Sequence, residues 1–277
     1  MKTILFPTDF SKCAIHASRY AAMLAEIYEA KIILLNVDYI PMVPSNHHSL
    51  EAKKVVTISM KKAQEDLKNF KNQFIEDTKM NPQRVLQQVV YGYPADKIVQ
   101  EANFLKADMI VMGTKGASYF LDKWLGTNAQ KVMKEAVCPV WIIPQKAKIK
   151  HPKKIMYAAD FKEDEILATQ KVVTFTEPLD AFCKVIHVQD IFEPIEKSIL
   201  NEQVKTINEE FGEDDVFARN LNRSDIIEGL EVYMETFNPD VLALAVHEKS
   251  FFAQFFNESV TKHFVQVSQL PILTFRK

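Results

Sequence analysis

Residues 108–127 read DMIVMGTKGASYFLDKWLGT, and this stretch decides the fold. Its first five residues form a short apolar run that a glycine closes, which is typical of a buried strand in a parallel sheet. Three glycines then follow in a fixed pattern, with two residues between Gly113 and Gly116 and nine more before Gly126. The next segment, residues 128–133, predicts the start of a helix.

The glycine pattern suits a phosphate-binding turn. A glycine at a strand end leaves backbone N–H groups exposed and lets a phosphate come close. A helix N-terminus adds free N–H groups and a partial positive charge, and the side chains of Thr127 and Asn128 add further donors. Glycine is scarce here, with 6 in 277 residues, so three in one pattern favour a functional turn. The alternative is that Gly113 and Gly126 are ordinary turn or cap residues and Thr127 only an N-cap.

The sequence contains an internal repeat, with two copies of one unit. Residues 1–11, MKTILFPTDFS, are similar to residues 152–161, PKKIMYAADF, and in both an apolar strand ends at Asp-Phe. The next strand, residues 33–37, matches residues 184–188 at the same offset of 151. Later segments match at an offset of 132, namely 108–112 with 240–244 and 138–142 with 270–274.

Each copy predicts alternating strands and helices, which is typical of a parallel sheet covered by helices on both faces. We therefore expect an α/β fold of two tandem, doubly wound, five-stranded parallel-sheet domains, Rossmann-like and with strand order 3-2-1-4-5. The domains are predicted at 1–145 and 152–277, with a charged linker between them. In the first copy the expected strands are 2–7, 31–37, 84–91, 108–112 and 139–143, and the expected helices are 12–29, about 50–77, 94–105 and 127–136.

The fold predicts where a ligand binds. A doubly wound sheet binds ligands beyond the carboxyl ends of its strands, where the strand order reverses between strands one and four. Asp9 ends the first strand and Gly113 follows the fourth, so both signals meet at that crevice. Asp9 can accept hydrogen bonds from a ribose hydroxyl or a base amino group, and the backbone around Val37 could bind a purine edge. The alternatives are that Asp9 only caps the first helix, for which Ser11 is also a candidate N-cap, and that Val37 is plain core.

Composition argues against several classes of partner. The net charge of −2 gives no global electrostatic case for binding nucleic acid or an anionic membrane. No apolar stretch approaches the ~20 residues that span a bilayer, and the sequence after Met1 carries no visible secretory signal. Three widely spaced cysteines are typical of free thiols in a reducing compartment, so we expect a cytoplasmic protein.

With this glycine pattern and these strand ends, the chain resembles a tandem universal stress protein, in the adenine-nucleotide α-hydrolase-like superfamily. The family's nucleotide pattern, G-x2-G-x9-G-[S/T], is matched in full by residues 113–127. The turn at residues 7–11, the strand end at Asn36-Val37 and the Cys138-Pro139-Val140 segment match as well. The resemblance is strong over about residues 1–145 and weak over 152–277.

The resemblance implies a regulatory protein that binds ATP, with or without Mg²⁺, and that pairs through its last strand. In the family the turn at Asp9 and the backbone at Val37 hold adenosine, and the glycine loops hold the phosphates. The cofactor-binding residues that it implies are Pro7, Thr8, Asp9, Val37, Met112, Gly113, Gly116, Gly126, Thr127 and Asn128. No catalytic residue and no metal ligand is implied.

The second copy departs from the pattern. At the offset of 132, Gly113 becomes Ala245, Gly116 becomes Glu248 and Gly126 becomes Glu258, while Ser259 stands opposite Thr127. Two carboxylates would then lie where phosphates belong, and like charges at low dielectric repel each other by several kcal/mol, on the order of 4 or more. We therefore expect the second copy not to bind ATP in the family manner.

Other functions stay open beside the regulatory nucleotide-binding protein. Slow ATP hydrolysis in the same crevice is one alternative, although no general base stands out and turnover near background is expected. A scaffold in which neither copy binds nucleotide is another.

The expected assembly is an intrachain pseudo-dimer in which the terminal strands 140–143 and 272–275 pair, and a homodimer stays open. A proline in place of Leu273 is expected to remove a hydrogen bond from that pairing.

Overall fold

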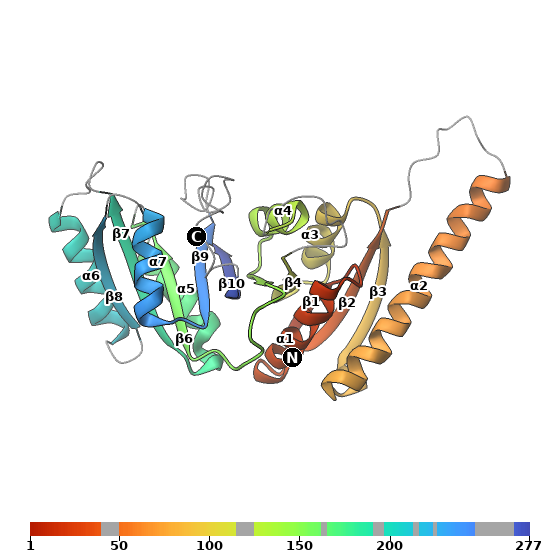
Figure 1. The fold of residues 1–277 in the computed structure, drawn as a ribbon, viewed down its shortest axis with the longest axis horizontal. Coiled ribbons are helices and arrows are strands. Elements are labelled where there is room, and N and C mark those ends of the chain that lie inside the picture. The colour runs from red at the N-terminus through yellow and green to blue at the C-terminus, as the bar shows by residue number, and fades with distance from the viewer. Residues whose placement is uncertain are drawn as a thin grey trace.

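The computed structural model describes residues 1–39, 50–114, 125–161, 165–190, 197–212, 216–223, 226–246 and 269–277. Strands and helices alternate along the chain (Figure 1). The first half contains β1 (Thr3–Pro7), α1 (Lys12–Ile27), β2 (Lys31–Asp38), α2 (Leu50–Thr78), η1 (Pro82–Arg84), β3 (Val85–Tyr91), α3 (Pro94–Phe104), β4 (Met109–Gly113), α4 (Thr127–Glu135) and β5 (Val140–Ile143). The second half contains β6 (Lys154–Ala159), α5 (Glu165–Thr176), η2 (Glu177–Leu179), β7 (Phe182–Asp190), α6 (Lys197–Phe211), β8 (Val216–Arg223), α7 (Ile226–Phe237), β9 (Val241–Val246) and β10 (Ile272–Arg276).

The ten strands form one sheet in the order β3-β2-β1-β4-β5-β10-β9-β6-β7-β8. Counted within each half, the order is 3-2-1-4-5, and neighbouring strands of a half pair in parallel. The predicted fold class is therefore confirmed, and the strands and helices of the first half begin and end within two residues of the expected positions. The division into domains at 1–145 and 152–277 stays a prediction.

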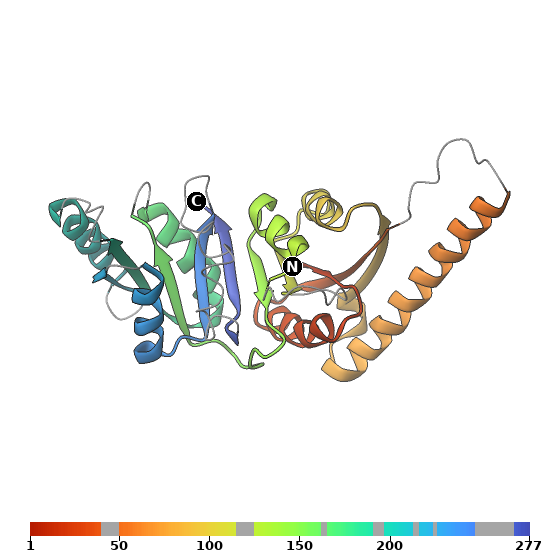
Figure 2. The same cartoon turned by 45° about the horizontal axis from the view of Figure 1, so that its top comes forward.

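Helices cover both faces of this sheet and form two separate cores. Side chains of α1, α2, α5 and α6 pack on one face, and side chains of α3, α4 and α7 pack on the other. Figure 2 shows α1, in red, and α3, in olive, on opposite sides of the strands of the first half. Central strands such as β1 are buried on both faces, which is why their sequences are continuously apolar.

The two halves meet through β5 and β10, which pair antiparallel as the sequence predicts. In this register Leu273 lies opposite Trp141, and Thr274 lies opposite Val140. Trp141 and Leu273 are also equivalent residues of the two copies, 132 positions apart. A local two-fold axis therefore passes between them, and the single chain contains its own pseudo-dimer contact.

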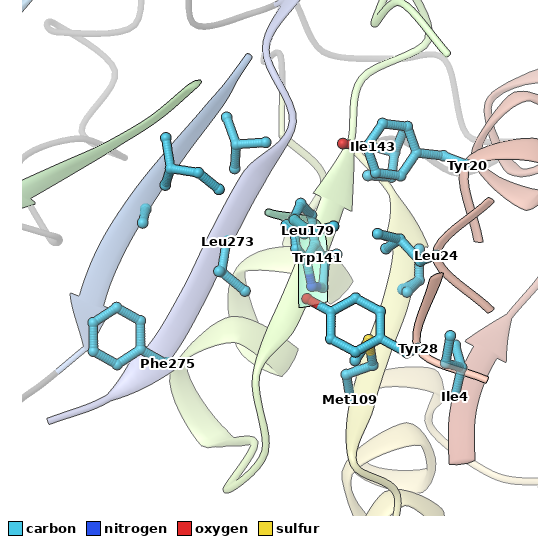
Figure 3. Close-up of a cluster of buried hydrophobic side chains, with 14 of the residues drawn as sticks. Ile4, Tyr20, Leu24, Tyr28, Met109, Trp141, Ile143, Leu179, Leu273 and Phe275 are labelled. Atoms are coloured by element: carbon cyan, nitrogen blue, oxygen red, sulfur yellow. The ribbon is translucent and has the colours of Figure 1, made fainter. Parts of the chain in front are cut away.

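A cluster of large buried side chains covers this seam (Figure 3). Trp141 is 1% exposed and its ring centroid lies 5.9 Å from that of Tyr20 on α1. The hydroxyl of Tyr28, which follows α1, donates a hydrogen bond to the carbonyl oxygen of Phe175 on α5. Burial raises the pKa of Tyr28, so this hydroxyl keeps its proton and its role as donor. Backbone pairing and side-chain packing thus join the two halves together.

The alternation of backbone groups along β10 corrects one expectation. The carbonyl of Pro271 and the N–H of Lys277 both bond to β9. Because every second residue of a strand directs its N–H and C=O to the same edge, Leu273 also faces β9. A proline at Leu273 would therefore weaken the β9–β10 pairing and not the seam between the halves. The residues whose backbone groups face β5 are Ile272 and Thr274.

Replacing Thr274 by proline should destabilise the seam. The substitution removes the N–H that faces the Val140 carbonyl, and a buried carbonyl left without its partner costs about 1–3 kcal/mol. Thr274→Val is the matched control, because it keeps the backbone N–H and the shape of the side chain. Urea unfolding should give a lower midpoint for the proline variant than for the valine variant. Equal midpoints would contradict the assigned pairing.

Candidate functional site

A pocket opens at the carboxyl ends of β1 and β4, where the strand order of the first half reverses. The space between its walls is about 750 Å³ when the solvent at its open mouth is included. The lining comes from three strand ends and from the first turns of α1, α3 and α4. The lining residues are Pro7, Thr8, Asp9, Ala14, Leu35, Val37, Pro94, Ile98, Met112, Gly113, Thr114, Gly126, Thr127, Asn128 and Ala129.

The turn after β1 is held against β2 by hydrogen bonds. The N–H of Thr8 donates to the Leu35 carbonyl at 2.8 Å, and Nδ2 of Asn36 donates to the Thr8 carbonyl at 2.9 Å. Phe10 adopts a left-handed backbone with φ of 62°, and its N–H donates to Oγ1 of Thr8 at 3.1 Å. These bonds fix the direction in which Asp9, between Thr8 and Phe10, leaves the sheet.

Asp9 is exposed and does not cap the first helix. Its Oδ1 accepts a hydrogen bond from the N–H of Ser11 at 3.1 Å, which closes a short turn. Oγ of Ser11 accepts from the N–H of Ala14 at 3.2 Å, so Ser11 is the N-cap of α1. The helix-cap alternative for Asp9 is therefore wrong, and the Asp9 carboxylate borders the pocket.

Val37 presents its backbone to the pocket and its side chain to the core. The carbonyl of Leu35 faces β1, because it accepts from Thr8. The N–H and C=O of Val37, two residues further along β2, point to the same edge. Here β1 has already ended at Pro7, so this edge of β2 borders the pocket. The Val37 side chain packs against the core on the α3 face, and binding of a purine edge by its backbone stays a prediction.

Gly113 has a structural reason to be glycine. A Cβ there would lie 2.8 Å from Sγ of Cys13 and 3.3 Å from the backbone carbonyl of that residue. Cys13 belongs to α1, and its Sγ also lies 3.6 Å from Oγ1 of Thr114. The missing side chain thus makes room for α1 against β4. That it also lets a phosphate approach stays a prediction.

The N-terminus of α4 borders the same pocket. Gly126 is its N-cap and makes no side-chain capping bond, and its N–H donates to the Thr114 carbonyl at 2.6 Å. The first N–H groups of a helix have no partner inside the helix, and Thr127, Asn128 and Ala129 all line the pocket. The first turn of α4 carries no acidic residue. This end of the pocket therefore offers donors and a partial positive charge, which suit an anionic group.

The structure brings nine of the ten predicted ligand residues into this one pocket. The tenth, Gly116, lies outside the described residues, and the role of all ten in binding stays a prediction. Sequence reasoning missed the apolar contribution of Pro94 and Ile98, at the start of α3. The signal was present in the sequence as Gly92-Tyr93-Pro94, because a proline after a glycine turn is typical of the first turn of a helix.

In the second half the backbone of the equivalent turn is kept. Phe161 has φ of 50° and so adopts the same left-handed backbone as Phe10, whose φ is 62°. Nδ1 of His187 donates to the Ala159 carbonyl at 3.0 Å, and His187 is the counterpart of Asn36 at the offset of 151. The two halves therefore share the geometry of this turn.

The side chains around the second turn differ from those of the first. Nζ of Lys277 lies 2.9 Å from Oδ1 of Asp160 and 2.8 Å from Oε2 of Glu165. All three side chains are at most 8% exposed. Asp160 is the counterpart of Asp9, and Glu165 is the counterpart of Ala14, which lines the first pocket. A buried ion cluster thus takes the place of open space beside this turn.

Lys277 carries its charge in this cluster. Burial lowers the Lys277 pKa, but the carboxylates of Glu165 and Asp160 outweigh it and raise the pKa above its usual value. The hydroxyl of Tyr157 and the N–H of Phe161 also donate to the Glu165 carboxylate. Glu248, Glu258 and Ser259, which mark the loss of the glycine pattern, lie outside the described residues.

Two further findings concern the described parts of the chain. None of their helices is both long enough and apolar enough to cross a membrane. They contain no group of three or more histidine, cysteine and carboxylate side chains with the geometry to hold a metal ion.

All three cysteines are free thiols, and burial raises the pKa of Cys138 to about 11.

Comparisons of the sequence with known proteins concern mainly the first half of the chain. A model of the universal stress protein family matches residues 1–144. A universal stress protein of Methanocaldococcus jannaschii is 33% identical over 156 residues, which are 55% of this chain and 84% of the relative. A second one from that organism is 26% identical over 162 residues, covering 52% of this chain and 96% of the relative.

A solved structure extends the likeness to the second half at the level of fold. The crystal structure of a universal stress protein from Archaeoglobus fulgidus has a TM-score of 0.72 to this chain. The match covers 99% of this chain and 98% of the other, at 16% identity.

Gly113→Ala should destabilise the protein through the contact with Cys13. Overpacking of this kind costs about 1–3 kcal/mol. Adding Cys13→Ala removes the sulfur that the new Cβ would meet and should restore part of the loss. A double-mutant cycle of urea unfolding measures this coupling. Strictly additive effects would show that the glycine is not needed for the packing of α1.

Lys277→Met should destabilise the protein strongly, because it leaves two buried carboxylates without their cation. Breaking a buried ion pair from one side costs about 3–5 kcal/mol. Lys205→Met is the matched control, since Lys205 pairs with Glu209 at an exposed position, where a pair contributes about 0.5 kcal/mol or less. Urea unfolding of both variants measures the difference. Similar losses for the two variants would contradict the proposed importance of the buried cluster.

Proposed function

Because this chain belongs to the universal stress protein family, we propose that its first half binds one adenine nucleotide, with ATP as the main ligand. The nucleotide serves a regulatory role, and the chain acts in the cytoplasm, in keeping with its three free thiols. The observation that carries this proposal is a pocket that combines an apolar wall, a free strand edge and a helix N-terminus.

The apolar wall suits the adenine ring. Leu35, Val37, Pro94, Ile98 and Met112 line one side of the pocket, and a flat base buried there removes apolar surface from water. The backbone N–H and C=O of Val37 border the same side. A donor and an acceptor next to each other can pair with the edge of adenine, which offers an amino group beside a ring nitrogen.

The polar side of the pocket suits the ribose and the phosphates. The exposed Asp9 carboxylate can accept hydrogen bonds from ribose hydroxyls. The N–H groups at the start of α4, with the side chains of Thr127 and Asn128, offer donors to phosphate oxygens. The nucleotide would thus lie across the carboxyl ends of the strands, with its base toward β2 and its phosphates toward α4.

The described lining of the pocket supports binding better than rapid hydrolysis. Among the lining residues in the described parts of the chain, Asp9 is the only one with an ionisable side chain. We assign this carboxylate to the ribose, which leaves no second group there for general acid–base work. Slow hydrolysis is the alternative that a turnover assay distinguishes.

The second half supports a stoichiometry of one nucleotide per chain. There Lys277 forms ion pairs with Asp160 and Glu165, the counterparts of two residues that line the first pocket. A nucleotide entering beside them would have to break a buried ion cluster, and Glu165 would add a carboxylate where the first pocket has the methyl group of Ala14. We therefore propose that the second half keeps the fold without the ligand.

Isothermal titration calorimetry with ATP tests this proposal. We expect a stoichiometry near one per chain for the wild-type protein. Asp9→Ala should lower the affinity by about 10- to 100-fold, because a hydrogen bond that involves a charged group contributes about 1.5–3 kcal/mol. Asp96→Ala is the matched control, since Asp96 lies on the surface of α3 and pairs with Lys131.

Four outcomes would contradict the proposal in different ways. A stoichiometry near two would refute the restriction to the first half. Equal affinities of the Asp9→Ala variant and the wild type would refute the assigned pose, and no heat of binding with any adenine nucleotide would refute nucleotide binding itself. Phosphate release well above background would move the function from regulation to hydrolysis.

A further inference from the structure

Two exposed tyrosines lie next to each other, close in sequence to Val37 and Pro94, which line the pocket. Tyr39 directly follows β2, and Tyr93 is the N-cap residue of α3. Their ring centroids are 5.6 Å apart and their planes are inclined by 44°. The two residues are 52% and 61% exposed, so neither ring serves to fill the core.

The backbone places this pair next to residues that line the pocket. Tyr39 comes two residues after Val37, so along an extended chain it leaves the sheet on the same face. Tyr93 immediately precedes Pro94. Val37 and Pro94 are both part of the apolar wall described above.

A fixed turn holds the two segments together. The N–H of Gly92 donates to the Asp38 carbonyl at 3.1 Å. Gly92 has φ of 144°, a backbone that residues with a side chain rarely adopt. The Tyr93 carbonyl then accepts from Lys97 as α3 begins. The position of Tyr93 beside Tyr39 is therefore set by backbone hydrogen bonds and by a glycine.

Exposed aromatic rings beside an apolar pocket need a reason, because burying them would be favourable. Aromatic faces stack on nucleobases, and larger bases offer more surface for stacking. A ring pair at the outer end of the apolar wall could continue that wall beyond Val37 and Pro94. Such a wall would contact the base and leave the ribose and phosphates untouched.

We propose that Tyr39 and Tyr93 form an aromatic wall that contacts the nucleobase and favours purine over pyrimidine nucleotides. This inference rests on the proposed function and extends it from nucleotide binding to selection of the base. The two tyrosines are specificity-determining residues, and they take no part in holding the phosphates.

Calorimetry on single variants tests the wall. Tyr39→Ala and Tyr93→Ala should each lower the affinity for ATP about tenfold and bring the ATP and CTP affinities closer together. Tyr39→Phe and Tyr93→Phe should keep the wild-type affinity, because stacking needs the ring and not the hydroxyl. Phe104→Ala is the matched control, since Phe104 is also exposed on α3 but lies at its C-terminal end.

A probe without a base separates stacking from general damage to the pocket. Inorganic tripolyphosphate should bind the alanine variants and the wild type equally. On the wild-type protein, NMR should show magnetisation transfer between adenine protons and tyrosine ring protons, a readout that requires no substitution. Transfer of this kind supports the wall even where an alanine variant folds poorly.

The failure of this inference is distinguishable from the failure of the proposed function. If the wild-type protein binds no adenine nucleotide, the proposed function is wrong. If it binds ATP while both alanine variants keep the wild-type ATP affinity and the wild-type preference over CTP, the aromatic wall is wrong. Absence of magnetisation transfer from a bound adenine would also overturn the wall.

Discussion

The antiparallel pairing of β5 with β10 is the contact on which the rest of the architecture depends. It joins two five-stranded sheets into one and covers two strand edges that would otherwise be open to other chains. Because the pairing is antiparallel, the strands of the two halves run in opposite directions across the seam.

Equivalent turns in the two halves share a backbone and differ in chemistry. Phe10 and Phe161 both have positive φ, and a side chain from the second strand of each half bonds to the turn carbonyl. In the first half small residues leave the crevice open. In the second half Glu165 stands at the position equivalent to Ala14, and Lys277 neutralises the charge of its carboxylate. The two halves thus have the same backbone frame, and a few side chains decide whether it encloses an open pocket or a buried ion cluster.

The pocket of the first half combines contributions from both layers of helices. The apolar side belongs to the core under α3 and α4, and the polar turn after β1 leads into α1 on the other face. Gly113 links these layers, because its missing side chain lets α1 approach β4. A change that displaces α1 would therefore also reach the pocket, which Gly113 lines.

The sequence by itself determined the order of strands and helices, the internal repeat, the strand order and the position of the pocket. These features follow from the local periodicity of apolar residues and from a strand order that reverses once, and so provides one crevice, in each half. Only the tertiary structure decided that Thr274 and not Leu273 faces β5, because that choice depends on the pairing register. It also brought Lys277 beside Asp160, 117 residues away, and Pro94 beside Val37. Such contacts depend on how distant segments pack, and no local pattern in a single chain records them.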